Sequence, residues 1–408
     1  MKYSITFPAE KVEGKVVLPA SKSISNRLLI IKALSSKDFS IEGLSDSDDT
    51  KALQMGLQAT ADVVDTCDGG TTMRFLTAYF AATAQAKTLT GSESIKNRPI
   101  GGLVDALNHL GAEITYLEKT GYPPVQTSGK ALSGNTVEIN GSVSSQFISA
   151  LLLVAPTLPE GLTINIKGDI VSEPYIGMTL GLMKQAGVKS KYEKKTISVA
   201  HQDYVSEGMT VEGDRSAASY WYQITALANE AELVLQGMNE KSLQGDAIFT
   251  QMANTLGIKT EFTPEGAVLS KIKNLCLTLW LDFNATPDLL PTMAVICCLK
   301  NIRFRFFGVQ NLHFKETDRI VALHNELMKL GFCIKEVQDG VIEWNGERCE
   351  PQEAISIATY NDHRIAMAFA PAAIIFPGLQ IENPEVVDKS YPNFWNDLKS
   401  IGVTIVEV

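Results

Sequence analysis

The stretch Leu18–Arg27, LPASKSISNR, contains the end of a strand, a turn and the start of a helix. The pattern predicts that Ser21 caps a helix whose first turn carries Lys22 and Ser23. Arg27 follows Ser23 by four residues and therefore shares its helix face. A hydroxyl, an ammonium and a guanidinium on one face suit a carboxylate or a phosphate. The alternative is an ordinary capped helix with solvated basic residues.

The same order of strand, small turn residue and polar helix start occurs at five more places. They are Asp68–Thr72, Asn140–Ser145, Glu212–Ser216, Asn284–Asp288 and Tyr360–Arg364. Each offers Ser, Thr, Asp or Asn as an N-cap, and a helix N-terminus attracts anions through its unpaired N–H groups and its dipole. Six ordinary caps are the plain interpretation. Four of the six also carry Lys, Arg or His in the first turn, which favours a shared cradle for phosphates and carboxylates.

A second repeat, a helix followed by glycine and a strand, indicates an internally repeated α/β fold. Its copies lie at Leu110-Gly111, Ala186-Gly187, Leu256-Gly257, Leu330-Gly331 and Ile401-Gly402. Alternating polarity predicts strands at 163–167 and 232–236, and a helical stripe predicts a helix at 174–186. A chain of 408 residues is too long for one core, so we expect two domains that meet near Val211–Gly213.

The composition restricts the partners of the chain. A net charge of −10 argues against nucleic acid, although a few focused cations still hold a small anion. The six cysteines form no C-x-x-C pair or zinc spacing, which suits a reducing cytoplasm and predicts no metal. The N-terminus lacks an apolar signal region, and the apolar runs 147–156 and 365–376 are too short for a bilayer, so we expect buried helices there and no membrane.

Taken together, these motifs resemble the 5-enolpyruvylshikimate-3-phosphate synthase family. Besides Leu18–Arg27, the resemblance rests on Thr71–Arg74, Arg98–Ile100, Ser144–Gln146, Lys315–Arg319, Asn361–Arg364 and Lys389–Pro392, which occur in the family's order. It implies a two-domain inverted α/β barrel, in which each domain holds three βαβαββ repeats. The implied domains are residues 1–20 with 213–408, and residues 21–212, with the active site in the cleft between them.

The resemblance implies a transfer of the enolpyruvyl group of phosphoenolpyruvate to the 5-hydroxyl of shikimate 3-phosphate, a step towards chorismate and the aromatic amino acids. The residues implied for shikimate 3-phosphate are Lys22, Ser23, Arg27, Ser144, Ser145, Gln146, Ser172, Tyr175, Asp288, Asn311 and Lys315. Those implied for phosphoenolpyruvate are Lys22, Gly70, Arg98, Gln146, Arg319, Arg364 and Lys389. No metal or organic cofactor is implied, and we expect a monomer whose domains close on the substrate.

The resemblance also suggests a division of the catalytic work. Asp288 is the expected base for the 5-hydroxyl, and either Glu316 or Lys22 protonates C3 of phosphoenolpyruvate. Lys315 and Arg319 have helical i, i+4 spacing, and two cations on one helix face favour an anion between them.

Several of these residues also have plain structural interpretations. Ser172 and Asp288 are alternatively helix caps, and Arg319 alternatively pairs with Glu316. His363 is either a ligand contact or a capping histidine.

Two features depart from the family pattern. The segment from Asp49 to Asp68 is short, so about one strand and part of a helix are expected to be missing from one repeat. Asp68-Gly69-Gly70 stands where the family has Asn-Ala-Gly, and the Asp68 carboxylate requires a partner such as Arg74 or Lys22. Gly70 leaves room beside its turn, so we expect inhibition by glyphosate.

Two alternatives compete with this hypothesis. A sister transferase that acts on UDP-N-acetylglucosamine requires a reactive cysteine in the first half of the chain, where Cys67 is the only cysteine. A non-catalytic sensor of shikimate phosphates is compatible with the short segment. The joint presence of Asp288, Lys315, Glu316, Arg319 and Arg364 argues against it.

Overall fold

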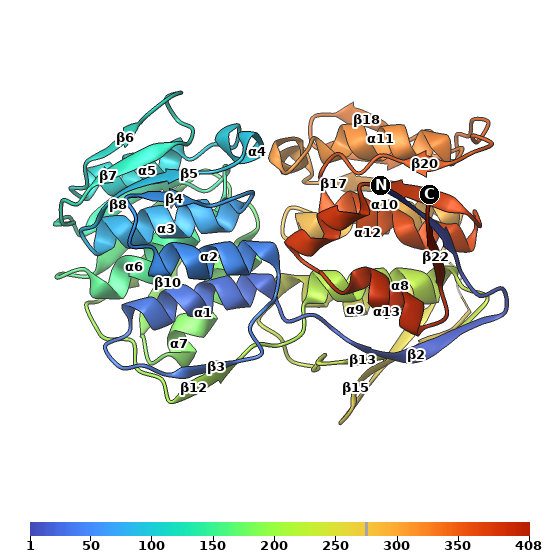
Figure 1. Cartoon of the computed structure of the whole chain (residues 1–408), viewed down its shortest axis with the longest axis horizontal. Coiled ribbons are helices and arrows are strands. Elements are labelled where there is room, and N and C mark those ends of the chain that lie inside the picture. Colours follow the sequence, from blue (N-terminus) through green and yellow to red (C-terminus); the bar gives the residue numbers. More distant parts are fainter. Residues whose placement is uncertain (274–275) are drawn as a thin grey trace. The chain divides into compact units, whose positions relative to one another are not determined.

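A computed structural model of the chain describes residues 1–273 and 276–408 (Figure 1). The chain forms two compact units: the first unit combines Met1–Ala20 with Glu212–Val408, and the second unit is Ser21–Val211. Glu212 belongs to the first unit, whereas it was expected in the second.

Both units repeat one pattern of strand, helix, strand, helix and two strands, and residues 278–344 show it completely. The elements are β16 (Thr278–Asp282), α10 (Leu290–Leu299), β17 (Arg303–Phe307), α11 (Arg319–Lys329), β18 (Lys335–Gln338) and β19 (Val341–Trp344). The sheet has the order β16-β17-β19-β18, in which β16 is parallel to β17 and the other neighbours are antiparallel. Phe304 and Phe306 of β17 are buried, as the two-residue period of a strand requires.

The other two repeats of the first unit each take a strand from the N-terminal segment. One consists of β2 (Lys11–Val17), α8 (Arg215–Leu227), β13 (Glu230–Gln236), α9 (Phe249–Thr255), β14 (Ile258–Thr263) and β15 (Gly266–Lys271). The other consists of β20 (Ser356–Ile357), α12 (His363–Phe369), β21 (Leu379–Glu382), α13 (Phe394–Ser400), β22 (Thr404–Glu407) and β1 (Lys2–Thr6). β2 lies parallel to β13, and β1 pairs with both β21 and β22. The N-terminal segment therefore folds with the C-terminal half, because two sheets there need its strands.

Two repeats of the second unit are complete. One consists of β4 (Val63–Asp65), α3 (Gly70–Ala82), β5 (Ala86–Thr90), α4 (Glu93–Lys96), α5 (Gly101–His109), β6 (Ile114–Tyr116) and β7 (Val125–Ser128). The other consists of β8 (Thr136–Asn140), α6 (Ser145–Val154), β9 (Leu162–Lys167), α7 (Glu173–Gln185), β10 (Ser190–Glu193) and β11 (Thr196–Val199). The expected strands at 163–167 and 232–236 and the expected helix at 174–186 are confirmed as β9, β13 and α7.

The third repeat of the second unit stops after its second helix. β12 (Gly208–Thr210) pairs in parallel with β3 (Ser40–Glu42), and the helices of this repeat are α1 (Lys22–Leu34) and α2 (Asp48–Gln58). The expected loss of one strand and part of a helix is wrong. The helix α2 keeps 11 residues, and both hairpin strands are absent, because only residues 59–62 lie between α2 and β4. A segment that short cannot fold into two paired strands.

A glycine ends the second helix of every complete repeat. Gly111, Gly187, Gly257, Gly331 and Gly402 follow α5, α7, α9, α11 and α13, with φ values of 104, 85, 87, 89 and 87°. This conformation is open to glycine without the steric cost that a Cβ brings, so the predicted helix–glycine–strand repeat is confirmed. The helix α2, which leads to no hairpin, ends at Ala59 with an extended backbone instead.

The apolar runs at 147–156 and 365–376 form buried helices, as expected, because α6 and α12 lie almost wholly inside their units. Cys297 and Cys298 are core residues of α10. Within residues 1–273 and 276–408, no helix combines the length and the apolar character that a membrane span needs.

Candidate functional site

The first helix of each repeat begins at one of the six predicted turns. Ser144, Asp214 and Asp362 cap α6, α8 and α12, and the side chain of each accepts a hydrogen bond from a first-turn N–H group. Ser21 occupies the same position before α1, but its side chain makes no capping hydrogen bond there. The prediction of a polar cap is wrong for α3, which begins after Gly69, and Asp288 lies inside a 3₁₀ turn, η3 (Pro287–Leu289), ahead of α10. Asp288 is therefore not the N-cap that the plain interpretation assigned to it.

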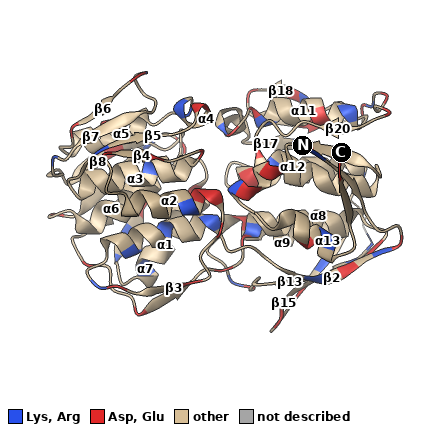
Figure 2. Ribbon diagram, viewed as in Figure 1, with Lys and Arg blue, Asp and Glu red and all other residues tan. Residues whose placement is uncertain are grey.

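A buried cluster of guanidinium and carboxylate groups lies where η3, α11 and α12 meet in the first unit. Arg319, only 1% exposed, binds Asp362 through Nε–Oδ2 and Nη2–Oδ1 distances of 2.7 and 3.2 Å. Its Nη1 lies 2.9 Å from Asp288 Oδ1, and its Nη2 lies 2.8 Å from Glu316 Oε2. The pairing of Arg319 with Glu316 is thus present, but it is one contact among three carboxylates. In Figure 2, acidic and basic segments lie together at one end of α12.

The carboxylate of Asp288 is surrounded by the cations of this cluster. Besides Arg319, it is bound by Arg364, whose Nη2 lies 2.7 Å from Oδ2, and the Nζ of Lys315 lies 3.9 Å from Oδ1. Burial opposes ionisation of Asp288, yet Arg364, Lys315 and Arg319 outweigh it and hold its pKa far below the ordinary value. The carboxylate is therefore ionised at neutral pH and has little tendency to keep a proton while these cations surround it.

Lys315 and Arg319 do not share a helix face, so that prediction is wrong. Asp318 caps α11 by accepting hydrogen bonds from the N–H groups of Ile320 and Val321, so the helix begins only at Arg319. Lys315 lies in the preceding bend. The two cations nevertheless meet, because both lie against Asp288.

The remaining predicted residues of the first unit border this cluster. The Nζ of Lys389 lies 3.6 Å from Glu316 Oε1. Asn311 lies in the 3₁₀ turn η4 (Gln310–Phe314), and His363 is the buried first residue of α12. The cap of α12 is Asp362 rather than His363, whose Nδ1 lies 3.8 Å from Asp362 Oδ1.

Asp246 is a buried acid of this region that no sequence motif points to. It lies in the 3₁₀ turn η2 (Gly245–Ile248), is 4% exposed, and accepts a hydrogen bond from the Ser216 hydroxyl. Burial, followed by the charge of Asp288, raises its pKa to about 7 against the opposing effects of Ser216 and Arg364. A single acid in a short turn carries no periodic signal, and only tertiary packing brings it near Asp288.

In the second unit, Arg27 is held deep in the protein. Its Nε lies 2.7 Å from Thr179 Oγ1, and its Nη2 lies 3.2 Å from Ser149 Oγ and 3.4 Å from the Tyr175 carbonyl oxygen. Nη1 donates to the Ser23 carbonyl at 2.8 Å. Burial lowers its pKa to about 10, a value at which it stays charged at neutral pH. Among the described residues, no carboxylate lies within 4 Å of the Arg27 nitrogens, so its charge suits an external anion.

Two further arginines converge on the Gly70 turn. A Cβ at Gly70 would lie 2.6 Å from Nη1 of both Arg74 and Arg98. Arg74 donates to the Gly70 carbonyl at 2.9 Å and to Gln146 Oε1 at 3.1 Å, and the Gln146 amide donates to Thr71 Oγ1. The predicted residues Gly70, Arg98 and Gln146 therefore lie together. Arg74, predicted only as a motif residue and as a possible partner of Asp68, joins them.

Lys22 pairs with Asp49, at 2.9 Å between Nζ and Oδ2, and both side chains are mostly buried. The Asp49 carbonyl accepts a hydrogen bond from the Thr72 hydroxyl, which links this pair to α3. Asp68 was expected to need Arg74 or Lys22. Its carboxylate accepts a hydrogen bond from the Ser92 hydroxyl, and Lys22 pairs with Asp49 instead.

The serines predicted for the phosphate lie at two helix starts of the second unit. Ser144 and Ser145 begin α6, and Ser145 is buried. Ser172 precedes α7 in the left-handed conformation, at φ 53°, and its side chain makes no capping hydrogen bond. A serine in that conformation is strained, and such strain is concentrated at functional sites. Tyr175 follows in the first turn of α7, with the Arg27 guanidinium 5.8 Å from its ring centroid.

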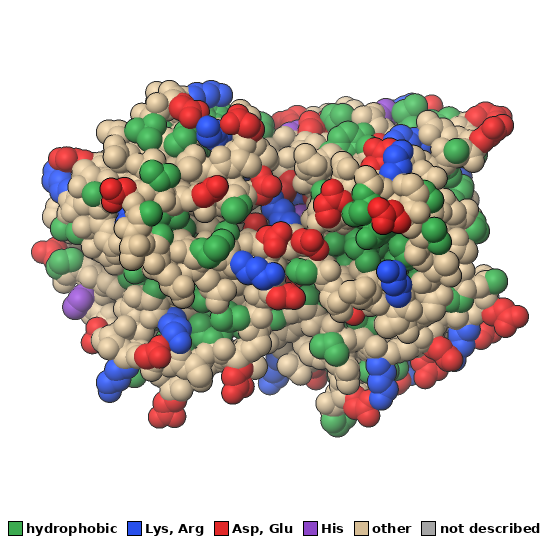
Figure 3. All heavy atoms as spheres, viewed as in Figure 1, with side chains coloured by type: hydrophobic (Ala, Val, Ile, Leu, Met, Phe, Trp, Pro, Cys, Tyr) green, Lys and Arg blue, Asp and Glu red, His purple; other side chains and the backbone are tan. Residues whose placement is uncertain are grey.

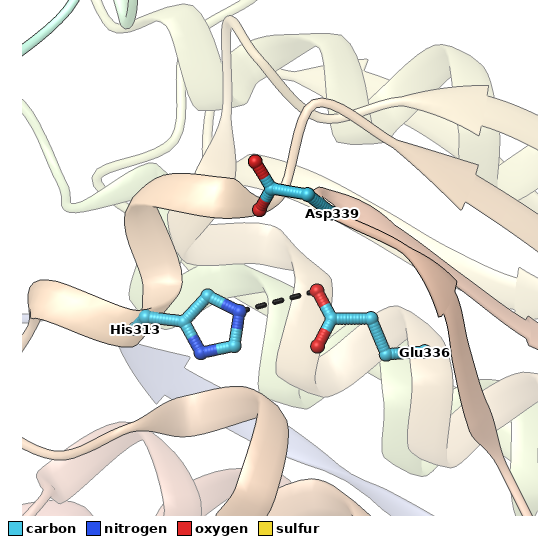
Figure 4. A group of neighbouring side chains, drawn as sticks. All are labelled: His313, Glu336 and Asp339. Atoms are coloured by element: carbon cyan, nitrogen blue, oxygen red, sulfur yellow. Dashed lines mark hydrogen bonds and ion pairs between the residues drawn. The ribbon is translucent and has the colours of Figure 1, made fainter.

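Among residues 1–273 and 276–408, one group has metal-ligand side chains close together, namely His313, Glu336 and Asp339, whose donor atoms lie within 4.8 Å of one another (Figure 4). Both ring nitrogens of His313 already face carboxylate oxygens, so the group is an ion-pair cluster. On the face drawn in Figure 3, acidic and basic side chains are interspersed without a continuous basic area.

Comparison with known proteins gives a consistent family assignment. The EPSP synthase (3-phosphoshikimate 1-carboxyvinyltransferase) family model matches residues 7–59 and 53–398, and the two matches meet within α2, next to the missing hairpin. A 3-phosphoshikimate 1-carboxyvinyltransferase of Bacteroides fragilis is 47% identical over 406 residues, which cover 99% of both chains. One of Shewanella halifaxensis is 36% identical and covers 97% of this chain and 98% of its own.

Solved structures agree on the fold. An EPSP synthase of Acinetobacter baumannii is 21% identical with a TM-score of 0.75 over all of both chains. The enolpyruvyl transferase NikO of Streptomyces tendae is 14% identical with a TM-score of 0.74, covering 100% of this chain and 98% of its own. The predicted two-domain enolpyruvyl transferase-like fold is confirmed. With a family match over most of its length and a relative at 47% identity, the chain belongs to the EPSP synthase (3-phosphoshikimate 1-carboxyvinyltransferase) family.

Proposed function

We propose that the protein transfers the enolpyruvyl group of phosphoenolpyruvate to the 5-hydroxyl of shikimate 3-phosphate and releases phosphate, in the biosynthesis of aromatic amino acids. The single observation that carries this proposal is the buried cluster of Asp288, Arg319 and Arg364, with Lys315, Glu316 and Lys389 at its border. Such a cluster offers a carboxylate and several cations at one point, as an acid–base reaction between anions requires.

The second unit supplies the groups for shikimate 3-phosphate. Arg27, beside Ser23 and Tyr175, is buried without a carboxylate partner among the described residues, so it is proposed to bind the shikimate carboxylate. Ser144, Ser145 and Ser172 stand at helix starts, where hydroxyl and N–H donors suit the 3-phosphate. Gln146 lies between this group and the Gly70 turn.

The residues proposed to bind phosphoenolpyruvate belong to both units. The Gly70 amide, Arg98 and Lys22 bind its phosphate, since Arg98 lies directly against Gly70. Arg319 and Arg364 bind its carboxylate, because a guanidinium matches both oxygens of a carboxylate. In this structure those arginines hold Asp288 and its neighbours, so an incoming carboxylate shares or takes over part of that pairing.

The proposed chemistry is an addition followed by an elimination. The 5-oxygen bonds to C2 of phosphoenolpyruvate as its proton passes to Asp288, and C3 gains a proton. C3 then loses a proton, the bond from C2 to the phosphate oxygen breaks, and phosphate leaves with the electron pair. Asp288 serves as base only once its cations also neutralise the substrate, since its pKa is otherwise too low.

Glu316 and Lys22 are the two proposed donors of the C3 proton. Glu316 lies between Arg319 and Lys389, and Lys22 lies against Asp49. Asn311 and Lys315 complete the proposed surroundings of the 5-hydroxyl, and the steps use protein side chains without a metal or an organic cofactor.

One observation weakens the alternative of a transferase for UDP-N-acetylglucosamine. Burial, together with Asp65 and Asp68, raises the pKa of Cys67, whereas a reactive cysteine needs a lowered one. The alternative of a non-catalytic sensor is weakened by the Bacteroides fragilis relative. That protein is named as a transferase, and it aligns with this chain over 406 residues.

A cytoplasmic monomer with two closing domains is proposed as the working form. The six free cysteines suit a reducing compartment. Closure of the two units around the substrates would exclude water from the reaction. A radius of gyration that shrinks when shikimate 3-phosphate saturates the protein is the expected scattering result, and an unchanged profile would contradict closure.

Phosphate release tests the function directly. The purified protein is mixed with shikimate 3-phosphate and phosphoenolpyruvate, each alone and both together, beside Asp288→Ala. We expect release only with both substrates and a loss of about 100- to 10,000-fold in the variant. Bound shikimate 3-phosphate without any release would leave a binding protein and refute the transferase proposal.

A further inference from the structure

His313 lies in η4, immediately before the bend that carries Lys315 and Glu316, and it is bonded on both sides. Its Nδ1 lies 2.8 Å from Asp318 Oδ2, and its Nε2 lies 3.1 Å from Glu336 Oε1. Figure 4 shows the imidazole directed at Glu336, with the Asp339 carboxylate close by. The ring therefore links three parts of one repeat: η4, the cap of α11 and strand β18.

The two contacts define the protonation state of the ring. An ionised carboxylate accepts hydrogen bonds and donates none. An imidazole ring donates from both of its nitrogens only as the imidazolium cation. Asp318, Glu336 and Asp339 face the ring with negative charge, and Lys315 lies two residues along the chain. Burial opposes the charge, but the bonds to Asp318 and Glu336 outweigh it and raise the pKa of His313.

Both partners of the ring are themselves fixed. The other oxygen of Asp318, Oδ1, accepts from the N–H groups of Ile320 and Val321 and so belongs to the start of α11. Glu336 Oε1 also accepts from the Gly340 N–H at 3.2 Å. The imidazolium thus fastens the bend to two rigid elements.

The bend has no regular secondary structure of its own. Lys315, Glu316 and Thr317 form neither helix nor strand, and the Phe314 side chain is 70% exposed. The His313–Asp318 contact closes the bend across its two ends. Within it, Glu316 has to meet Arg319 and Lys389, and Lys315 has to meet Asp288.

We propose that His313 is a positioning residue for the transferase reaction: bonded to Asp318 and Glu336, it holds the bend so that Lys315 and Glu316 reach Asp288 and Lys389. This inference rests on the proposed function, and it predicts a defect in turnover rather than in substrate binding. An ångström of misplacement in reacting groups costs as much as about 100-fold in rate.

Three variants separate positioning from general damage. His313→Gln keeps a similar size and one donor nitrogen but no charge, and His313→Arg supplies a permanent cation with several N–H donors. His324→Gln is the matched control, because His324 is a half-buried histidine of α11 that, among the described residues, is bonded only to the Ile334 carbonyl. We expect His313→Gln to lower kcat about tenfold with KM changed less than about twofold. We expect His313→Arg and the control to stay near wild type.

The pH profile gives a second readout. His313 loses its proton as the pH rises through its raised pKa, so the wild-type bridge weakens on the alkaline side, whereas arginine keeps it. The ratio of the kcat of His313→Arg to that of wild type is therefore expected to rise with pH. A flat ratio, or equal losses in the Gln and Arg variants, would overturn the proposal.

A measurement that does not depend on turnover distinguishes this inference from the proposed function. NMR of the ring nitrogens in the unmodified protein at pH 6.5 is expected to show two N–H protons on His313. A neutral His313 ring at that pH would refute the bridge even if phosphate release is normal. If wild type releases no phosphate, the proposed function fails, and the NMR result still decides whether the bridge exists.

Discussion

Replacing Asp246 by Asn is expected to change how the stability of the first unit depends on pH. Asp246 is 4% exposed, and among the described residues its Oδ1 has no hydrogen-bond partner, whereas Oδ2 accepts from Ser216. Asn has nearly the same shape and keeps an acceptor for Ser216. The substitution therefore removes a charge from the protein interior with little repacking.

The magnitude follows from the pKa. Burial, then Asp288, raise the pKa of Asp246 from 3.8 in the unfolded chain to about 7. Between these values the native protein keeps a proton that the unfolded chain has lost, so native stability falls as the pH rises. The interval spans about three pH units at about 1.4 kcal/mol each, or about 4 kcal/mol in all. Above pH 7 no further loss arises from this group.

The assay uses the tryptophans, since Trp221, Trp280, Trp344 and Trp395 all belong to the first unit. Urea unfolding followed by their fluorescence at pH 4, 6 and 8 gives the stability of that unit for wild type and Asp246→Asn. We expect the advantage of the variant to grow by about 4 kcal/mol from pH 4 to pH 8. Glu350→Gln, at an exposed acid of the same unit, serves as control. An advantage that is the same at all three pH values would refute the reasoning.

Two substitutions test the arginine groups. In Gly70→Ala the new Cβ would lie 2.6 Å from Nη1 of Arg98, so Arg98 must move. In steady-state assays we expect the KM for phosphoenolpyruvate to rise about tenfold and inhibition by glyphosate to weaken. The control Gly177→Ala, whose new Cβ would meet open space, should change neither quantity. Equal effects on the KM for shikimate 3-phosphate would count against a phosphoenolpyruvate role for this turn. In Arg319→Lys the lysine cannot reach all three carboxylates at once. We expect the free energy of unfolding in urea to fall by about 3 kcal/mol and kcat/KM to fall as well. Arg303→Lys, at an exposed site of β17, is the control. Unchanged stability would show that the buried contacts of Arg319 do not stabilise the first unit.

Much of the fold could be predicted because the repeat leaves local signals. The glycines at 111, 187, 257, 331 and 402 mark helix ends in sequence, and all five adopt the left-handed conformation that the pattern requires. The sequence shows that one repeat is short, but the prediction of which elements it lacks is wrong. The sequence shows how many residues are missing from this repeat. Whether the helix is truncated or the hairpin is lost depends on where α2 ends, which the structure shows.

The sequence by itself determined which residues can carry charge and donors at the helix starts, since caps, glycine turns and hydrophobic periods are local properties of the chain. Only the tertiary structure decided how those groups are paired. Arg319 meets Asp288 and Asp362 across 31 and 43 residues of chain, and Lys22 meets Asp49 across 27. The balance of charge around Asp288, the raised pKa of Asp246 and the His313 bridge all depend on such distant contacts. Electrostatic energies follow distance and burial in the folded protein, and neither quantity can be read from residue spacing along the chain.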